Sequence, residues 1–467
     1  MLRRSRRGAL KLIGGLALAP ILAACGGAAP PAPTTAPTPA GSARAAPTAE
    51  AKSAAQQVGA VQSTSSQPAA PGAVTLRFYT WTAAANLPAW KAGVEAFQQK
   101  YPKVQIQLDY TPGQQYWDKL TVEYAGGTPP DVIYASPADA ERVATQGVVL
   151  DLANLIKDDK FPIEDINPQA QRPYQWGGKV WGICAFTDTR YLIYNKNLFK
   201  DAGLPELPQT WDGEFSIDTF VSYAKKLTDP SKQTWGYVFE DKQPAARWSW
   251  LFGGYYWDSM DYPTKAVMDS PESTEGFQFV QDMVQKLKIA PNPAANMGGS
   301  DPMFQTGKVG MIWAGFKSAA AIHPAIKDFE WGISTIPKGK RRVSNLSPNG
   351  FQVVSKTKLR DESWNLVKYL TADDGNVYLS KATSMPANRK IDFAKVSPLQ
   401  PWQNKLLQDA LTTGLPEVPH PNIKPQFWTI FNEEMDALLA GSKPAPDAVK
   451  SMASRINAAF QPYVVEK

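Results

Sequence analysis

The sequence predicts an α/β protein folded into two lobes, between which the chain crosses more than once. Its 467 residues exceed what a single hydrophobic core usually supports, so two lobes are the expected arrangement. Residues 74–110 read as strand, helix and strand, the pattern of a parallel pair of strands. An extended segment at 185–194 is followed by a short helix and several prolines, and we interpret it as a crossing between the lobes.

The first residues indicate export. Arg6 and Arg7 sit in a twin-arginine pattern, although Ala9 replaces the usual phenylalanine, so the general export route stays an alternative. The apolar run at 12–21 is too short to span a bilayer and is typical of a signal peptide. Residues 22–26, LAACG, look like a lipobox, which predicts a signal peptide at 1–24 and a lipid on Cys25. The alternatives for Cys25 are an ordinary buried thiol and a chance cysteine.

Residues 25–72 form the expected tether. Alanine, proline, threonine, serine, glycine and glutamine dominate it, so it has almost nothing with which to build a core. Its root-mean-square reach as a flexible coil would be roughly 40 Å. The formal net charge of +6 comes from residues 1–72, the signal peptide and the tether together, because residues 73–467 hold 42 side chains of each sign. A nucleic-acid partner therefore has no electrostatic support.

Cysteine and histidine are too scarce for a disulfide framework or a metal cluster. The only cysteines are Cys25 and Cys184, and the only histidines are His323 and His420. We expect no metal and no cofactor.

The folded part is expected to begin at residue 73. Strands are indicated where apolar and polar residues alternate, and helices where apolar residues recur every three or four positions. The expected strands are 74–81, 104–110, 132–134, 235–239 and 352–355, and the expected helices are 88–101, 116–125, 196–202, 216–227, 269–288, 361–370 and 373–381. Asp131 precedes the third strand and is expected to brace its turn.

A family resemblance rests on the segment that ends the crossing. Tyr194-Asn195-Lys196 is followed by Leu198-Phe199, Ala202-Gly203-Leu204, Pro208 and Thr210-Trp211. This order resembles the signature of the family 1 extracellular solute-binding proteins, the ligand receptors of ABC importers. Further similar elements are GGTPPDVIY at 126–134, MFQTGKVGMIWAG at 303–315 and SMPANR at 384–389, so the resemblance covers residues 74–460.

The resemblance implies a two-lobed periplasmic-binding-protein fold of type II, with a ligand cleft between lobes joined by hinge crossings. We expect an N-lobe from 73–187 and 316–372, and a C-lobe from 188–315 and 373–467. It also implies a saccharide receptor that is tethered to the outer face of the cytoplasmic membrane and acts as a monomer. Its partners would be a small sugar and the transmembrane subunits of an ABC permease.

Aromatic residues are the first candidates for ligand contacts. In open α/β sheets ligands bind beyond the carboxyl ends of the strands. A pyranose has an apolar C–H face that suits a flat ring, and a rim of hydroxyl groups. The tryptophans expected there stand at strand ends or beside glycine, or match a sugar-stacking position of the family: Trp81, Trp250, Trp257, Trp313 and Trp428. The alternative for each is a place in the core.

Asp188 is the leading polar candidate. It lies six residues before Tyr194, where maltose-type members carry a sugar-binding acid; the alternative is a hinge residue paired with Arg190 or Arg247. The other polar or loop candidates are Ser136, Asp139, Gly315, Phe316, Lys317 and Asn349. Ala135 and Ala138 replace the tryptophan and aspartate of the maltose type, which argues against maltodextrin itself.

Two functions are compatible with these residues. The first is a receptor that binds a saccharide and does not change it. The second is a secreted glycoside hydrolase, since paired carboxylates and aromatics also line such sites. The chain has no G-x-S-x-G, no H-E-x-x-H, no P-loop and no dinucleotide fingerprint, which favours the receptor. Glycerol phosphate and polyamines stay open as alternative solutes.

Overall fold

The described residues belong to one compact unit with two hydrophobic cores. The computed structural model describes residues 71–82, 86–111, 114–260, 263–293, 299–372, 374–381, 384–416 and 424–460. Each core packs around its own sheet, which confirms the predicted two-lobed α/β fold. We call these the first and second lobes. The predicted signal peptide, Cys25 and all of the predicted tether except its last two residues lie outside the described residues.

A six-stranded sheet forms the first lobe. Its strands in spatial order are β13 (Met385–Pro386), β6 (Ile183–Thr187), β12 (Asn349–Val353), β3 (Val132–Ala135), β1 (Val74–Thr80) and β2 (Val104–Tyr110). The predicted parallel pair is confirmed, with Val74 opposite Val104. β3 is parallel to β1, so both strands end at the same edge, whereas β12 runs antiparallel to β3. The loops after β1 and β3 therefore lie close together.

Helices cover this sheet because their apolar residues recur on one face. In α2, Trp90, Val94 and Phe97 are buried in the first core, at the helical spacing seen in the sequence. The helical elements of this lobe are α2 (Leu87–Lys100), α3 (Gln114–Ala125), α4 (Pro137–Thr145), α5 (Ala153–Asp158), η2 (Ile163–Asp165), α6 (Pro168–Gln171), η3 (Arg172–Tyr174), α14 (Arg360–Ala372) and α15 (Asp374–Ser380). A small hairpin joins β4 (Gln175–Trp176) to β5 (Lys179–Val180).

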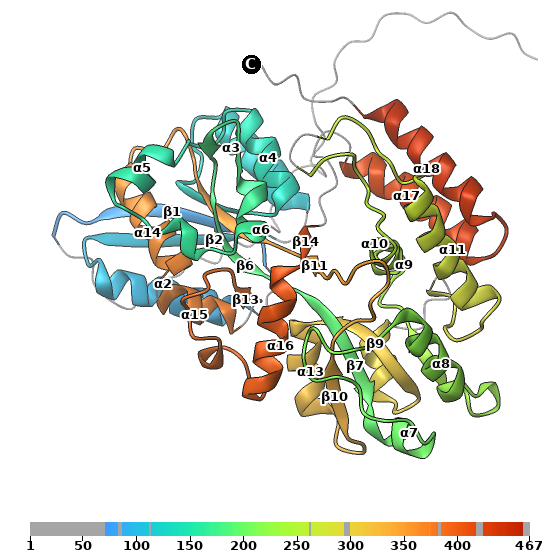
Figure 1. Ribbon diagram of the computed structural model, residues 1–467. Helices are drawn as coiled ribbons and strands as arrows, with labels where there is room; N and C mark the ends of the chain where they lie inside the picture. Colours follow the sequence, from blue (N-terminus) through green and yellow to red (C-terminus); the bar gives the residue numbers. More distant parts are fainter. Residues whose placement is uncertain are drawn as a thin grey trace, which may run out of the picture. The chain divides into compact units, whose positions relative to one another are not determined.

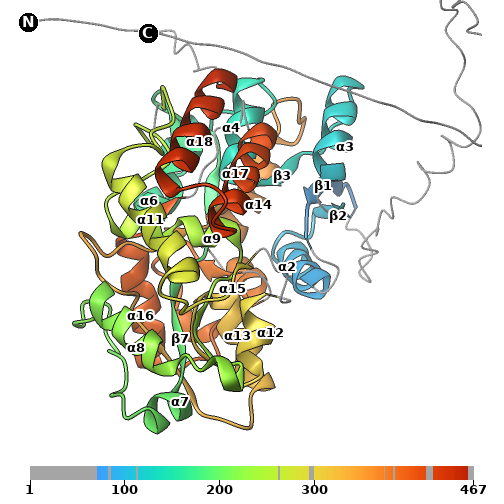
Figure 2. The same cartoon turned by 90° about the vertical axis from the view of Figure 1, so that its right-hand side faces the viewer.

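A four-stranded sheet forms the second lobe. Its spatial order is β10 (Trp331–Ser334), β7 (Arg190–Asn195), β9 (Val309–Gly315) and β8 (Trp235–Val238). Every residue of β9 is buried, as expected for a strand covered on both faces. The helical elements are α7 (Lys196–Asp201), α8 (Ile217–Leu227), η4 (Pro230–Lys232), α9 (Lys242–Ala246), α10 (Trp248–Leu251), α11 (Pro271–Gln285), α12 (Ser300–Gln305), α13 (Phe316–Ala325), η6 (Phe393–Lys395), α16 (Pro401–Thr412), α17 (Lys424–Leu439) and α18 (Ala445–Ala459). Figure 2 shows α17 and α18 side by side, and α11 contacts both.

The chain crosses between the sheets at three places. The first crossing joins β6 to β7 through Asp188 and Thr189, and Figure 1 shows β6 continuing toward β7. The second leaves β10 and reaches β12 through β11 (Asn345–Leu346), which pairs with β14 (Leu415–Pro416). The third follows β13, because β13 belongs to the first sheet and Phe393 to the second core. The predicted extended segment at 185–194 is thus two strands with a crossing between them.

Two of the predicted lobe boundaries are wrong. The sequence predicts that the chain returns to the first lobe at residue 316. However, α13 packs in the second core and β10 pairs with β7, so both still belong to the second lobe. The chain returns only at the second crossing. The sequence predicts that the chain leaves the first lobe for the second at residue 373. However, α15 packs on α2 and β13 pairs with β6, so the chain stays in the first lobe until after Ala387. A strand's sequence does not reveal which of two sheets it joins.

Helices long and apolar enough to cross a bilayer were sought in the described residues, and none was found.

A tight contact in the second lobe gives a stability prediction. A methyl group on Gly236 of β8 would lie 2.0 Å from the Ala224 carbonyl oxygen of α8, so the strand and helix would have to separate. We expect Gly236→Ala to lower the free energy of unfolding by about 2 kcal/mol or more, measured by urea denaturation. Gly93→Ala in α2 is the control, since its methyl meets Leu379 at an ordinary 3.6 Å. A helical alanine there should be neutral or stabilising by about 0.5 kcal/mol. Equal effects would contradict the close packing of β8 on α8.

Candidate functional site

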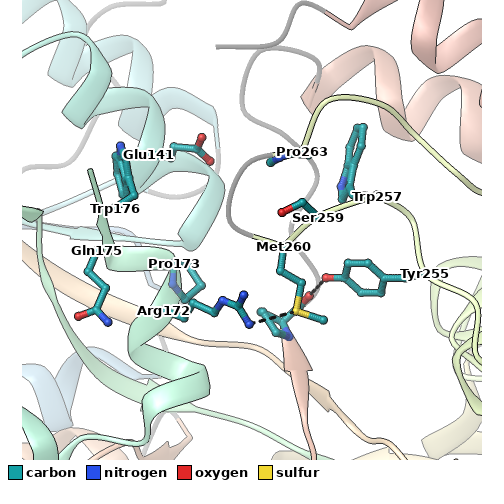
Figure 3. Close-up of a pocket in the computed structure, with 11 residues that line it drawn as sticks. Glu141, Arg172, Pro173, Gln175, Trp176, Tyr255, Trp257, Ser259, Met260 and Pro263 are labelled. Carbon is teal, nitrogen blue, oxygen red and sulfur yellow. Dashed lines mark hydrogen bonds between the residues drawn. The ribbon is translucent and has the colours of Figure 1, made fainter. Parts of the chain in front are cut away.

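A pocket with a cavity volume of about 50 Å³ in this conformation is lined by residues of both lobes. Figure 3 shows its two sides. The lining residues are Glu141, Arg172, Pro173, Gln175 and Trp176 from the first lobe, and Tyr255, Trp257, Ser259, Met260, Pro263 and Pro416 from the rest of the chain. A molecule bound there would touch both lobes. We call this the cleft pocket.

The first-lobe wall combines a helix, a 3₁₀ turn and a hairpin. Glu141 comes from α4 and Arg172 from η3. Trp176 ends β4 immediately before Gly177 and Gly178, whose φ angles of +61° and +72° allow the tight turn. The Trp176 ring packs against Trp181 across the hairpin, with ring centroids 5.6 Å apart. The hairpin thus presents one half-buried indole to the pocket.

The second-lobe wall is built from the aromatic segment after α10. Trp257 packs against Phe427, with centroids 5.8 Å apart, and against Phe460 at 5.2 Å. The Tyr255 hydroxyl donates to the carbonyl oxygen of Pro416, so this ring is tied to β14. Arg172 Nη1 lies 3.6 Å from Met260 Sδ, a contact that joins the two walls. Figure 3 places Trp176 and Trp257 on opposite sides of the pocket.

Part of the pocket lining lies beside the second crossing. Pro416 lies in β14, and β14 pairs with β11 of the second crossing. A molecule in the pocket would therefore lie next to the strand pair at that crossing.

Two ionisable side chains, Glu141 and Arg172, line the pocket. Burial raises the pKa of the Glu141 carboxyl from its ordinary value to about 8. At neutral pH this carboxyl is therefore mainly protonated, and it offers an O–H donor as well as a carbonyl acceptor. The pocket thus contains donors and acceptors between two aromatic surfaces.

Asp188 belongs to a buried ion-pair network at the first crossing. One carboxylate oxygen accepts from the backbone amides of Thr189 and Phe316, both at 2.9 Å. The other accepts from Arg190 Nη1 at 3.1 Å, and Arg190 Nε reaches Glu240 at 3.2 Å. Burial raises the pKa of the Asp188 carboxyl, while the Arg190 charge and the two amides oppose that shift. The Arg190 pairing of the predicted alternative is present, and both oxygens are engaged in this conformation.

The predicted aromatic candidates are distributed unevenly around the cleft pocket. Trp257 lines it, and Trp428 on α17 contacts Phe427, the ring on which Trp257 packs. Trp81 follows β1 and packs against Tyr134, with ring centroids 5.2 Å apart. By contrast, Trp250 is fully buried in the second core and Trp313 is 3% exposed. Neither of these two rings has a free face for a sugar, because both pack in the second core.

The polar candidates lie at two places. Ser136 precedes α4 and donates to Asp139 Oδ2 at 2.6 Å, so these two residues contact each other one turn before Glu141. Gly315 ends β9, and the Phe316 amide donates to Asp188 at the first crossing. Asn349 opens β12 and donates to the Ser347 carbonyl at 3.3 Å. Their contact with a ligand stays a prediction, and the side chain of Lys317 is not among those described.

Sequence reasoning missed most of the cleft pocket. The missed lining residues include Glu141, Arg172, Trp176, Tyr255 and Met260. Trp176 stands immediately before a glycine pair, a signal that was used for other tryptophans and could have found it. Arg172 and Glu141 carry no such local signal, because only the fold brings them to the same wall.

Two sheets with separate cores, three crossings and a pocket lined from both sides define a two-lobed ligand-binding protein. The chain belongs to the bacterial extracellular solute-binding proteins, whose family model matches residues 81–377. Members of this family are exported binding proteins.

Comparisons with known proteins agree with this assignment. The galactooligosaccharide-binding protein of Bacillus subtilis is 22% identical over 78% of this chain and 84% of its own. An ABC substrate-binding protein of Listeria monocytogenes, solved with cycloalternan, superposes with a TM-score of 0.70 at 22% identity, over 83% of this chain and 98% of that one. A sugar transporter protein of Rhizobium etli, solved in an open conformation, gives a TM-score of 0.70 at 19% identity, over 83% and 100%. These two structures confirm the fold.

The network at the first crossing predicts a structural role for Asp188. Asp188→Ala would leave the Arg190 guanidinium without its nearer carboxylate and the Phe316 amide without an acceptor. We expect the free energy of unfolding to fall by about 3 kcal/mol in urea denaturation. Asp409→Ala is the control, because Asp409 forms an exposed pair with Lys405 within α16, and it should change stability by less than about 0.5 kcal/mol. A stability loss for Asp188→Ala no larger than that of the control would contradict the network.

The raised pKa of Glu141 gives a pH-dependent prediction. Between about pH 4.5 and pH 8 the folded protein keeps a proton on Glu141 that the unfolded chain has released. The contribution of Glu141 to the free energy of unfolding therefore falls as the pH rises through this window. Glu141→Gln removes this contribution, so the variant should gain stability relative to the wild type on going from pH 5 to pH 9. Denaturant titrations at both pH values check this, and a constant difference between the two proteins would contradict it.

Proposed function

We propose that this protein is the saccharide-binding component of an ABC importer and that the cleft pocket is its sugar site. The supporting observation is that aromatic rings line both walls, Trp176 on the first lobe and Tyr255 and Trp257 on the second. Such rings suit the C–H faces of a pyranose, and the neighbouring carboxyl, guanidinium, amide and hydroxyl groups suit its rim. The names of the relatives above, a galactooligosaccharide-binding protein and a cycloalternan complex, support an oligosaccharide.

Capture would follow from contacts that exist only when the lobes are closed. A sugar between Trp176 and Trp257 touches both walls at once, so it binds the closed form more tightly than the open one. The three crossings are the places where backbone rotation would close the cleft. Closure buries the sugar without any chemical change, and the closed form is what a permease would recognise. No catalytic step is part of this proposal.

The proposed setting is the outer face of the cytoplasmic membrane. The lipobox predicts a lipid on Cys25, and residues 26–72 would hold the folded part at a distance from the bilayer. We propose a monomer whose partners are the sugar and the transmembrane subunits of the permease. Of the polar and aromatic candidates, Trp81, Ser136, Asp139, Asn349 and Trp428 are proposed to reach the sugar after closure.

A sugar panel and two variants test the site. We expect one or more of maltotriose, galactotriose, cellotriose and their monosaccharides to raise the melting temperature and change tryptophan fluorescence. Trp176→Ala and Trp257→Ala should each weaken that sugar's affinity at least tenfold, about 1.4 kcal/mol, in calorimetric titration, because each removes one wall.

Trp402→Ala is the matched control. Its indole is 36% exposed on α16 and does not line the pocket, so affinity should stay within twofold of the wild type. A melting temperature unmoved by every sugar in the panel would overturn the saccharide proposal. Release of shorter sugars, followed by chromatography, would instead favour the glycoside hydrolase.

A further inference from the structure

The second crossing carries two adjacent arginines that hold different turns of the second lobe. Arg341 donates from Nε to the Trp250 carbonyl at 2.6 Å and from Nη2 to the Gly254 carbonyl at 2.8 Å. Its backbone amide donates to the Leu251 carbonyl at 3.2 Å. Arg341 therefore satisfies three carbonyl oxygens at and just beyond the C-terminus of α10.

Two of these carbonyls, those of Trp250 and Leu251, end α10, and the third belongs to Gly254 in the turn that follows. The Trp250 carbonyl also accepts from the Gly253 amide at 3.1 Å, so Arg341 adds a charged donor to a bond that closes the turn. A cation near the C-terminal carbonyls of a helix is favourable. Gly253 has a φ of +101°, so the turn after α10 adopts a conformation that few residues allow. The guanidinium fork matches two of these oxygens at once, which a lysine ammonium on a flexible stem does less well.

The turn that Arg341 holds leads directly into the cleft wall. Tyr255 follows Gly254, and Trp257 is two residues further on. We propose that Arg341 is a positioning residue for ligand recognition: by capping α10 it sets the place of Tyr255 and Trp257 on the second-lobe wall. This inference rests on the proposed sugar site for its effect on binding, but not for its effect on the turn.

The same segment also connects the wall to the hinge. Three residues after Arg341, Ser344 accepts from the backbone amide of Arg190 at 2.6 Å and donates to the Arg190 carbonyl at 2.8 Å. Residues 341–344 thus link the aromatic wall to the first crossing. A displacement of the wall by a bound sugar would be passed to both crossings through this short stretch of chain.

Arg342 provides an internal control. Its guanidinium donates to the carbonyls of Trp211 and Gly213, the latter at 2.7 Å, and so also fixes a turn. Burial lowers the pKa of both guanidinium groups from the ordinary value, so their environments are comparable. The turn that Arg342 holds does not contribute to the cleft pocket. The two arginines therefore differ mainly in which turn they hold.

Hydrogen exchange and sugar titration of Arg341→Lys and Arg342→Lys test the inference in the full-length protein. In Arg341→Lys we expect the amides of Phe252, Gly253 and Gly254 to exchange at least tenfold faster, with no change at 211–216. Arg342→Lys should show the opposite pattern. The probe is the sugar of the panel (maltotriose, galactotriose, cellotriose or one of their monosaccharides) that raises the wild-type melting temperature most. Its affinity should fall at least tenfold in Arg341→Lys and stay within twofold in Arg342→Lys.

The two measurements separate the possible failures. Unchanged exchange at 252–254 in Arg341→Lys overturns the cap, and faster exchange with unchanged affinity overturns the positioning role. If no sugar of the panel binds the wild type, the proposed function fails, while the exchange pattern still decides whether Arg341 holds the turn. If a lysine variant does not fold, the pair Arg341→Gln and Arg342→Gln is measured in its place, with the same outcomes required.

Discussion

The hydrogen-bond cluster where two crossings meet is the constraint on which the two-lobed arrangement depends. Ser344 of the second crossing bonds to both backbone groups of Arg190, and its oxygen also accepts from the Thr189 hydroxyl at 2.8 Å. The Ser347 amide donates to the Asp188 carbonyl at 3.2 Å. Because these bonds join the two crossings, one cannot rotate far without the other. Lobe closure in this protein would therefore involve both crossings together.

A network of charged side chains also stabilises the first crossing. Asp188, Arg190 and Glu240 form a chain of ion pairs, and Arg247 Nη1 lies 3.9 Å from Glu240. A buried ion pair gains little net stability, since desolvation opposes its Coulomb attraction, but breaking one is costly. The network therefore restricts which arrangements of β7, β8 and the start of α13 are allowed. Because Asp188 lies on the first crossing, the network ties that crossing to the second sheet.

Local sequence patterns predicted the elements well, and the site only in part. The parallel pair of β1 and β2 and the helix α2 followed from periodicity, and Asp131 braces its turn by accepting from the Arg77 amide at 2.8 Å. Trp257, which was predicted from its aromatic segment beside glycine, lines the cleft pocket, and its contact with a ligand stays a prediction. Trp250 shares that sequence context and is fully buried. Only the direction in which the chain turns after α10 decides that Trp250 enters the core and Trp257 lines the pocket.

The cleft pocket combines residues from near 141, 172–176, 255–263 and 416, which no local pattern connects. Its first-lobe aromatic comes from the β4–β5 hairpin. The strand end of β3 holds the small residue Ala135, which offers no ring for stacking. If the cleft pocket is the sugar site, as proposed above, a sugar would stack on the hairpin residue Trp176, with Pro416 of β14 also in the lining. The position of the aromatic rings, and not the fold, would then decide which saccharide is bound.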